Sequence, residues 1–185
     1  SNHSTWQVAD IYNGSSDGSP GMNMEILVGD TIYFNADDGN TGHELWAHDT
    51  SNHSTWQVAD IYNGSSDGNP GTYMQILVGD TIYFNADDVS TGRELWAHDT
   101  SNHSTWQVAD ISSGSSSSNP GMNMGILVGD TIYFNAYDGS TGREMWAHDT
   151  SKHSTWQVAD ISSGSSSSNP GTYMQILVGD TIYFN

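Results

Sequence analysis

Cysteine is absent from this chain, and lysine and arginine together number only three, against 22 aspartate and glutamate residues and a formal net charge of −19. The absence of cysteine excludes disulfide bonds, thiolate zinc sites and thiol catalysis. The shortage of basic side chains excludes nucleic acid as a partner, because nucleic acid is bound through a positively charged footprint. No hydrophobic run is long enough to cross a membrane and no signal-peptide pattern is visible, so we expect no direct membrane insertion.

What the sequence does contain is a 50-residue unit that occurs almost four times. The segment SNHSTW at 1–6 returns at 51–56 and 101–106, and at 151–156 with Lys152 in place of asparagine. A unit of this size cannot bury its own apolar surface, so neighbouring copies must supply the contacts. We therefore predict one repeat domain, 1–185, with repeats 1–50, 51–100, 101–150 and 151–185, the last incomplete. Because the pattern starts and stops mid-way, we expect the chain to be part of a longer protein.

Each repeat contains four strand-like runs separated by Gly, Asn, Asp and Ser. In the first copy these runs are Thr5–Ile11, Met24–Val28, Thr31–Asn35 and Glu44–His48. They are short, rich in β-branched and aromatic residues, and in part alternate between apolar and polar positions. Gly29-Asp30 is typical of a hairpin turn between the second and third runs. No stretch has helical spacing of useful length, so the fold class is predicted to be all-β.

Four short antiparallel strands per repeat, several of them apolar on both faces, are typical of a β-propeller blade that is covered on both sides by its neighbours. We predict a β-propeller built from four-stranded antiparallel blades of about 50 residues. In this interpretation the chain begins on an outermost strand, continues through three complete blades and ends after the first two strands of another. Four blades in one chain, two chains that close an eight-bladed ring, a longer parent chain, and an open blade array or fibre all stay open.

The same residues resemble known repeat families. The segment from Asp30 to Ile61 resembles a kelch-type blade, with a strand that carries Ile-Tyr-Phe, an acidic loop, a third strand ending in His-Asp and a fourth strand led by Trp56. Glu44-Leu45-Trp46-Ala47-His48-Asp49-Thr50 is similar to the ELWxxDGT repeat of large secreted or surface proteins of bacteria and archaea. The resemblance covers essentially the whole chain. It implies a propeller fold and a location outside the cell or at its surface.

A catalytic role is not indicated. His48, Asp49 and Ser51 are close in sequence, but a catalytic triad is defined by its geometry in the fold and not by adjacency. The same set recurs in the second and third copies, so no copy is singled out, whereas an active site concentrates unlike groups in one place. We therefore predict no enzyme activity and no catalytic residue.

Two groups of residues are candidates for metal binding, a pair of histidines and a set of oxygen ligands in the acidic loops. His48 and His53 recur at a spacing of five, but zinc needs three or four converging ligands, so we interpret them as a strand-end and a turn histidine. The acidic loops place several oxygen ligands near glycine, as calcium prefers. The candidate calcium ligands are Asp37, Asp38, Asn40, Glu44, Asp87, Asp88 and Glu94. The alternative is a solvated turn in which aspartate bonds its own backbone.

Two further types of site involve sugars. Tyrosines beside amide and carboxylate side chains in loops are suited to stacking against sugar rings, and repetition would add avidity. The candidate ligand-binding residues are Tyr12, Tyr62, Tyr73 and Tyr173. N-x-S/T acceptors for glycosylation occur at Asn2, Asn13, Asn52, Asn63 and Asn102.

Taken together, the sequence predicts a non-catalytic extracellular binding, adhesion or structural module. The alternatives are a carbohydrate-binding propeller lectin and a self-assembling surface-layer or filament protein. The expected partners are further copies of the same repeat, in a homo-oligomer or in a longer chain, and glycans. Calcium is the only cofactor that the residues suggest.

Overall fold

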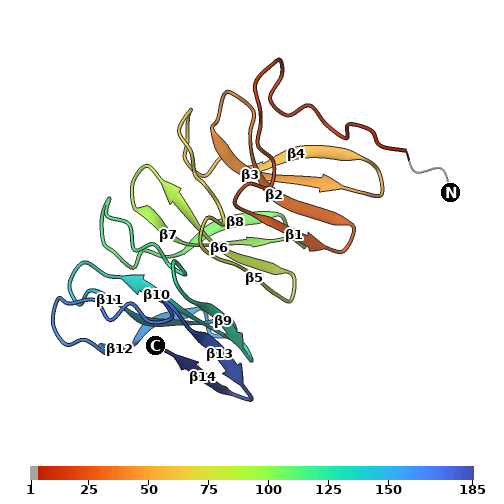
Figure 1. Ribbon diagram of the computed structural model, residues 1–185. Helices are drawn as coiled ribbons and strands as arrows, with labels where there is room; N and C mark the ends of the chain where they lie inside the picture. Colours follow the sequence, from red (N-terminus) through yellow and green to blue (C-terminus); the bar gives the residue numbers. More distant parts are fainter. Residues whose placement is uncertain (1–3) are drawn as a thin grey trace. The chain divides into compact units, whose positions relative to one another are not determined.

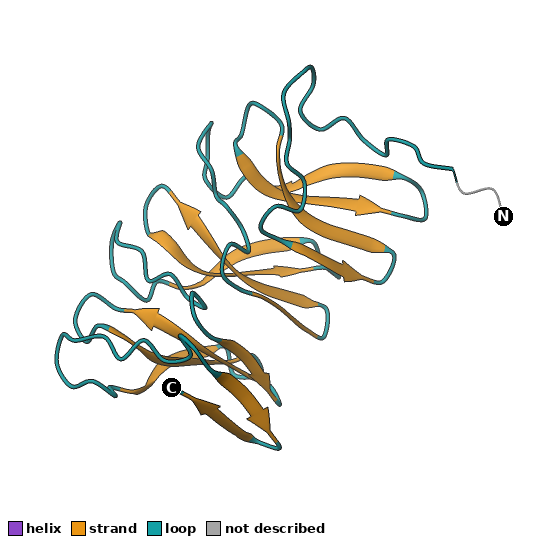
Figure 2. Cartoon of the chain, viewed as in Figure 1, coloured by secondary structure: helices purple, strands orange, loops and turns teal. Residues whose placement is uncertain are grey.

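The computed structural model describes residues 4–185, which form short strands joined by loops (Figures 1 and 2). The described strands are β1 (Glu25–Val28), β2 (Thr31–Asp37), β3 (His43–Asp49), β4 (Ser54–Ala59), β5 (Gln75–Val78), β6 (Thr81–Asp88), β7 (Gly92–Asp99), β8 (Ser104–Ala109), β9 (Gly125–Val128), β10 (Thr131–Tyr137), β11 (Arg143–Asp149), β12 (Ser154–Ala159), β13 (Gln175–Val178) and β14 (Thr181–Phe184). Within these residues no helix is long and apolar enough to span a membrane.

The strands pair into sheets in sequence order. Strands β1–β4, β5–β8 and β9–β12 each form a four-stranded sheet, and β13 pairs with β14 alone. Every pairing is antiparallel. Three complete blades followed by the first two strands of another is the arrangement predicted from the repeat, and it is confirmed.

The strand prediction is wrong at one place. Thr5–Ile11 forms no strand, and Trp6 is exposed, although the equivalent residues of the next copy form β4. In β4 the backbone pairs with β3, for example Trp56 opposite Ala47. Residues 5–11 have no third strand before them in this sequence to pair with. A strand pattern is therefore not sufficient without its partner strand.

Each blade opens with a hairpin that a buried asparagine holds in place. Gly29 has φ 60°, which suits glycine in the turn between Val28 and Thr31. Asn35, fully buried in β2, accepts hydrogen bonds through Oδ1 from the backbone N–H groups of Asn23 (2.8 Å) and Met24 (3.0 Å). We call this set the asparagine clamp. The same two hydrogen bonds recur at Asn85 and Asn135, which are also fully buried, and at Asn185, which is exposed.

The chain divides into two compact units, 1–70 with β1–β4 and 71–185 with β5–β14. In the second unit the two complete blades share one hydrophobic cluster. The blade β5–β8 contributes Met74, Tyr83, Leu95, Ala97 and Ile111, and the blade β9–β12 contributes Ile132, Phe134 and Ala136. Each blade thus buries apolar side chains that it could not cover by itself. The assignment of 1–185 to a single repeat domain stays a prediction.

Candidate functional site

The histidine, aspartate and serine of each copy are used in separate short-range contacts. His48 Nδ1 is 2.8 Å from the hydroxyl of Thr55, whereas the Ser51 hydroxyl donates to Asp49 Oδ1 at 2.6 Å. The aspartate therefore contacts the serine directly, and the imidazole does not stand between them as a catalytic triad requires. The other two copies repeat both contacts.

Burial keeps the equivalent histidines of the second unit uncharged. Desolvation lowers the pKa of His98 and of His148 to about 4, with a further lowering by the neighbouring turn histidine. In the first unit the rings of His48 and His53 stack with their centroids 6.4 Å apart, and His53 lies in a turn with φ 60°. These positions match the interpretation as strand-end and turn histidines.

The acidic loop of the first blade satisfies its own backbone. Asp37 Oδ1 accepts from the Gly39 N–H at 2.7 Å, and Asp38 Oδ1 accepts from the N–H groups of Asn40 and Thr41 at 2.8 and 2.9 Å. Burial raises the pKa of Asp38, but these hydrogen bonds outweigh it and the net effect is a lowered pKa. The loop has the geometry of turns that aspartate side chains stabilise.

The second acidic loop differs in its first carboxylate. Asp87 lies 4.0 Å from the Arg93 guanidinium. Burial nevertheless raises the pKa of Asp87, against the lowering effect of that guanidinium. Asp88 repeats the turn of Asp38 by accepting from Ser90 and Thr91. Both loops therefore hold their carboxylates in contacts within the loop or with a neighbouring strand.

Glu44 and Glu94, two of the calcium candidates, are fully buried and bond the backbone of a linker instead of the acidic loop. Glu44 accepts hydrogen bonds from the N–H groups of Ile61 (2.8 Å), Tyr62 (3.3 Å) and Gly68 (2.7 Å), and so holds the linker that leads out of its blade. Burial raises the pKa of both carboxyls to about 7, although the hydrogen bonds oppose it. Sequence reasoning missed this role because the partners lie 17–24 residues away.

The calcium candidates are thus not brought together. Asp38 holds its own turn, and Glu44 holds a linker. Over residues 4–185 no three His, Cys, Asp or Glu side chains gather closely enough to hold a metal ion. Calcium binding stays a prediction from the sequence, without a ligand set already formed in the fold.

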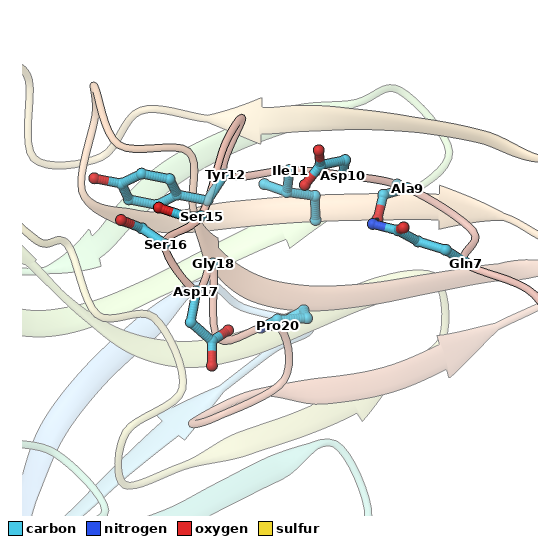
Figure 3. Close-up of a pocket in the computed structure, with 10 residues that line it drawn as sticks. All are labelled: Gln7, Ala9, Asp10, Ile11, Tyr12, Ser15, Ser16, Asp17, Gly18 and Pro20. Carbon is cyan, nitrogen blue, oxygen red and sulfur yellow. The ribbon is translucent and has the colours of Figure 1, made fainter.

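The four candidate tyrosines occupy different environments. Tyr12 lines a cavity of about 330 Å³ together with Gln7, Asp10, Ser15 and Asp17 (Figure 3). Its ring covers Gly39 so closely that a Cβ there would approach the ring to 2.6 Å. The cavity lining combines this aromatic ring with carboxylate, amide and hydroxyl groups, which are the kinds of group that a sugar site uses.

The residues that line the Tyr12 cavity do not include Tyr62, Tyr73 or Tyr173. Tyr62 is half-buried, and Tyr73 lies beneath the Arg93 guanidinium, 5.3 Å from its ring centroid. Tyr173 is 90% exposed and lines a separate cavity of about 370 Å³ with Asn123 and Asn169.

The described glycosylation acceptors are all exposed. Asn13 and Asn63 lie in loops. The side-chain amides of Asn52 and Asn102 donate to Asp49 and Asp99 at 2.7 Å within a tight turn. Asn2 lies outside the described residues. The acceptors thus stay predictions, with Asn13 and Asn63 in the more open settings.

A surface that sequence reasoning did not single out is the apolar face of β13–β14. Met174 and Tyr183 are 49% and 52% exposed, whereas their equivalents Met74 and Tyr83 are 4% and 3% exposed. The two hairpins have the same sequence, QILVGDTIYFN, at 75–85 and 175–185. The repeated sequence shows that both hairpins carry the same apolar residues. Whether those residues are exposed depends on the elements that pack against each hairpin.

No family model and no curated protein sequence matches the chain. Several solved structures resemble it, including the following three. A puromycin hydrolase S511A mutant complexed with PGG has a TM-score of 0.51 and 11% identity over 74% of this chain and 20% of the hydrolase. A putative TolB from Agrobacterium tumefaciens has a TM-score of 0.47 and 14% identity over 85% of this chain and 55% of that protein. TolB from Acinetobacter baumannii has a TM-score of 0.40 and 14% identity over 70% of this chain and 29% of that protein.

These likenesses concern the fold. The chain spans a fifth of the hydrolase and about half of the Agrobacterium protein. At 11% identity the likeness to the hydrolase speaks for architecture alone, and with the four-stranded antiparallel sheets it identifies the fold as β-propeller blades. The predicted fold class is therefore confirmed.

Proposed function

We propose that this chain is a non-catalytic binding or structural module of β-propeller blades that acts at the cell surface or outside the cell. One observation carries the non-catalytic part. The residues that could act in catalysis are His48, Asp49 and Ser51. They make the same contacts with turn and strand neighbours as their counterparts do in the other complete blades. Catalysis needs unlike groups that converge on one point, and here like groups are spread over several blades.

The extracellular part of the proposal is supported by sequence. The ELWAHDT segment resembles the ELWxxDGT repeat of secreted and surface proteins, and the strongly acidic, cysteine-free composition suits a soluble surface in contact with salt. The exposed N-x-S/T loops around Asn13 and Asn63 are consistent with this location.

The test of the non-catalytic role uses a fluorophosphonate probe, which labels activated serine nucleophiles. We expect no labelling of the folded chain, because each of the three serines, Ser51, Ser101 and Ser151, donates its hydroxyl to an aspartate rather than to a histidine. Labelling that disappears when all three serines are replaced by alanine would show an activated nucleophile and reject the proposal.

A carbohydrate-binding function is the second candidate, because the Tyr12 cavity combines an aromatic ring with carboxylate, amide and hydroxyl groups (Figure 3). A glycan array measures it directly. If sugars bind there, Tyr12→Ala removes the signal and Tyr137→Ala, at an exposed tyrosine that ends β10, does not. Equal signals from both variants, or no signal from the parent chain, would reject this candidate.

A further inference from the structure

Two steps of the chain join an asparagine to a glycine, Asn13-Gly14 and Asn63-Gly64. In such a step the glycine nitrogen can attack the side-chain amide of the asparagine, because the glycine has no side chain to hinder the approach. Asn63 is exposed in the linker that follows β4, and Gly64 has φ 117°. A Cβ placed on Gly64 would meet nothing within 4 Å. The surroundings of Asn63 therefore leave room for this reaction.

The Asn63-Gly64 step is also free of hydrogen bonds. Over residues 4–185, neither the Asn63 side-chain amide nor the Gly64 N–H has a hydrogen-bond partner. The linker is held on either side of this step instead, where Glu44 accepts from the N–H groups of Tyr62 (3.3 Å) and Gly68 (2.7 Å). The step at 63–64 can therefore rearrange between two points of the linker that stay in place.

A neighbouring step in the same linker is held much more firmly. Asp67 precedes Gly68, and an aspartyl-glycine step can undergo the same ring closure as an asparaginyl-glycine step. The Gly68 N–H, however, donates to the buried Glu44, and Asp67 Oδ1 accepts from the His43 N–H at 2.9 Å. Both reacting groups are thus engaged elsewhere, so the fold protects this step and leaves Asn63-Gly64 unprotected.

The other described asparagines lack this combination, because none of them is followed by a glycine in this sequence. Asn69 precedes proline, whose nitrogen has no proton to lose. The Asn52 side chain donates to Asp49 at 2.7 Å within a tight turn. In the third and fourth copies a serine, Ser113 or Ser163, stands before the same glycine. The reactive step is therefore confined to the first two copies.

We propose that Asn63, and Asn13 with it, are sites of spontaneous deamidation. The Gly64 nitrogen bonds to Cγ of Asn63, the bond from Cγ to Nδ2 breaks, and Nδ2 leaves as ammonia with the proton from the Gly64 nitrogen. Water then opens the resulting succinimide ring at either of its two carbonyl carbons. One opening gives aspartate, and the other gives isoaspartate, in which the main chain runs through the side chain. Water is the only co-reactant, and nothing is oxidised or reduced.

Deamidation removes the atom that a glycan would use. Asn63 belongs to an N-x-S acceptor at 63–65, and a glycan would be attached through its Nδ2. Once ammonia has left, no nitrogen remains there to accept a glycan, and the linker carries an additional negative charge. The modification thus distinguishes the first two copies from the last two. It goes beyond the proposed binding or structural role and does not depend on it.

The first experiment follows the unglycosylated parent chain in heavy-oxygen water at mildly alkaline pH, where the glycine nitrogen loses its proton more readily. Peptide mass spectrometry after increasing times should show heavy oxygen at Asn63 and Asn13, in both aspartate and isoaspartate products. Peptides that contain Asn52 or Asn102 should stay unchanged. An unchanged Asn63, or equal rates at all asparagines, overturns the proposal.

The second experiment uses two variants of the step. Asn63→Ser introduces the serine of the third and fourth copies and removes the conversion at this position. Gly64→Ala slows it by at least about tenfold, because a methyl group hinders the nitrogen and disfavours φ 117°. Asn13 in the same chains is the internal reference and keeps its rate. Both substitutions are at exposed positions, so thermal unfolding stays unchanged. A parental rate at Asn63 in the Gly64→Ala chain overturns the proposal.

The third experiment tests the structural contrast within the linker. In the folded chain Asp67 should not isomerise, because Glu44 holds the Gly68 N–H, whereas in concentrated urea isoaspartate should form there as well. Asn63 should convert at similar rates in both conditions, since no hydrogen bond has to break first. A rate at Asn63 that is far lower in the folded chain than in urea would show that the fold protects it and would overturn the proposal.

Discussion

Hairpins β5–β6 and β13–β14 have one sequence and two environments. Tyr83 is 3% exposed against the following blade, and Tyr183 is 52% exposed. The backbone pairing is nevertheless the same, with Ile76 opposite Tyr83 and Ile176 opposite Tyr183. The sequence of one repeat therefore specifies the hairpin, whereas the next repeat provides its burial. In a repeat protein, the contribution of a side chain to stability depends on the neighbour that covers it.

The largest difference in stability is expected when the same tyrosine is replaced in the two hairpins. Tyr83→Ala should lower the free energy of unfolding by about 3–4 kcal/mol, because it leaves a cavity between two packed blades. Tyr183→Ala should change it by less than about 0.5 kcal/mol in dilute solution. Urea denaturation of the two variants measures both values. Equal losses would mean that the two hairpins are buried alike.

A somewhat smaller effect is expected at the linker that leads to the exposed hairpin. Glu144 accepts hydrogen bonds from the N–H groups of Ile161 and Ser168, both at 2.8 Å, and from the Ser168 hydroxyl at 2.7 Å. Glu144→Ala leaves these donors without their acceptor, at a cost of about 2–3 kcal/mol. Hydrogen exchange should become faster in β13–β14 and stay unchanged in β5–β6. Unchanged exchange in both hairpins would contradict the anchoring role.

Glu94 is the equivalent of Glu144 in the blade β5–β8, and its titration makes the free energy of unfolding depend on pH. Burial raises the pKa of Glu94 from 4.5 to about 7. A raised carboxyl pKa means that the folded chain binds the proton more tightly than the unfolded chain. This contribution is therefore complete below pH 4.5 and is lost as pH rises through about 7.

Denaturation of parent and Glu94→Gln chains at several pH values tests this. Relative to the Glu94→Gln chain, the parent should lose stability as pH rises from about 4.5 to about 7, since glutamine does not titrate. His98 and His148, whose lowered pKa values remove stability on the acid side as pH falls from 6.5 to about 4, are common to both chains and cancel in the difference. Parallel profiles would refute the assignment.

The smallest loss of stability is expected from a substitution that gives the two linkers the same residue. Ser168 occupies the position that Gly68 holds before β5–β6, and only the serine adds a side-chain hydrogen bond to the buried glutamate. Ser168→Gly should therefore cost about 1 kcal/mol. Ser163→Gly, in the exposed part of the same linker, serves as the control in the same thermal unfolding experiment. A loss that is no greater than in the control would count against the extra bond.

Much of the fold could be predicted from the repeat. Runs such as Thr31–Asn35 and Glu44–His48 lie within β2 and β3, because β-branched and aromatic residues and the Gly29-Asp30 turn act over a few neighbouring residues. The grouping into blades also followed. Thr5–Ile11 shows the limit, since its strand pattern has no partner to pair with in this sequence.

The site was less predictable for a physical reason. Asp38 and Glu44 both suggested calcium ligands by their residue type and spacing. In the fold, Asp38 accepts hydrogen bonds from backbone N–H groups of its own turn, whereas Glu44 accepts from N–H groups as far away as that of Gly68. Which donor a carboxylate finds is decided by the path of the linker, and the path depends on packing between elements. The exposed apolar face of β13–β14 could not be predicted either, because identical residues are buried elsewhere.

The asparagine clamp affects how the number of repeat copies can change in evolution. Its acceptor, Asn35, and its donors, the N–H groups of Asn23 and Met24, all belong to one copy of the repeat. A recombination event that duplicates or removes a whole copy carries every member of the clamp with it. No new partner has to evolve at the junction, so the number of copies can vary in steps of 50 residues while each hairpin stays closed.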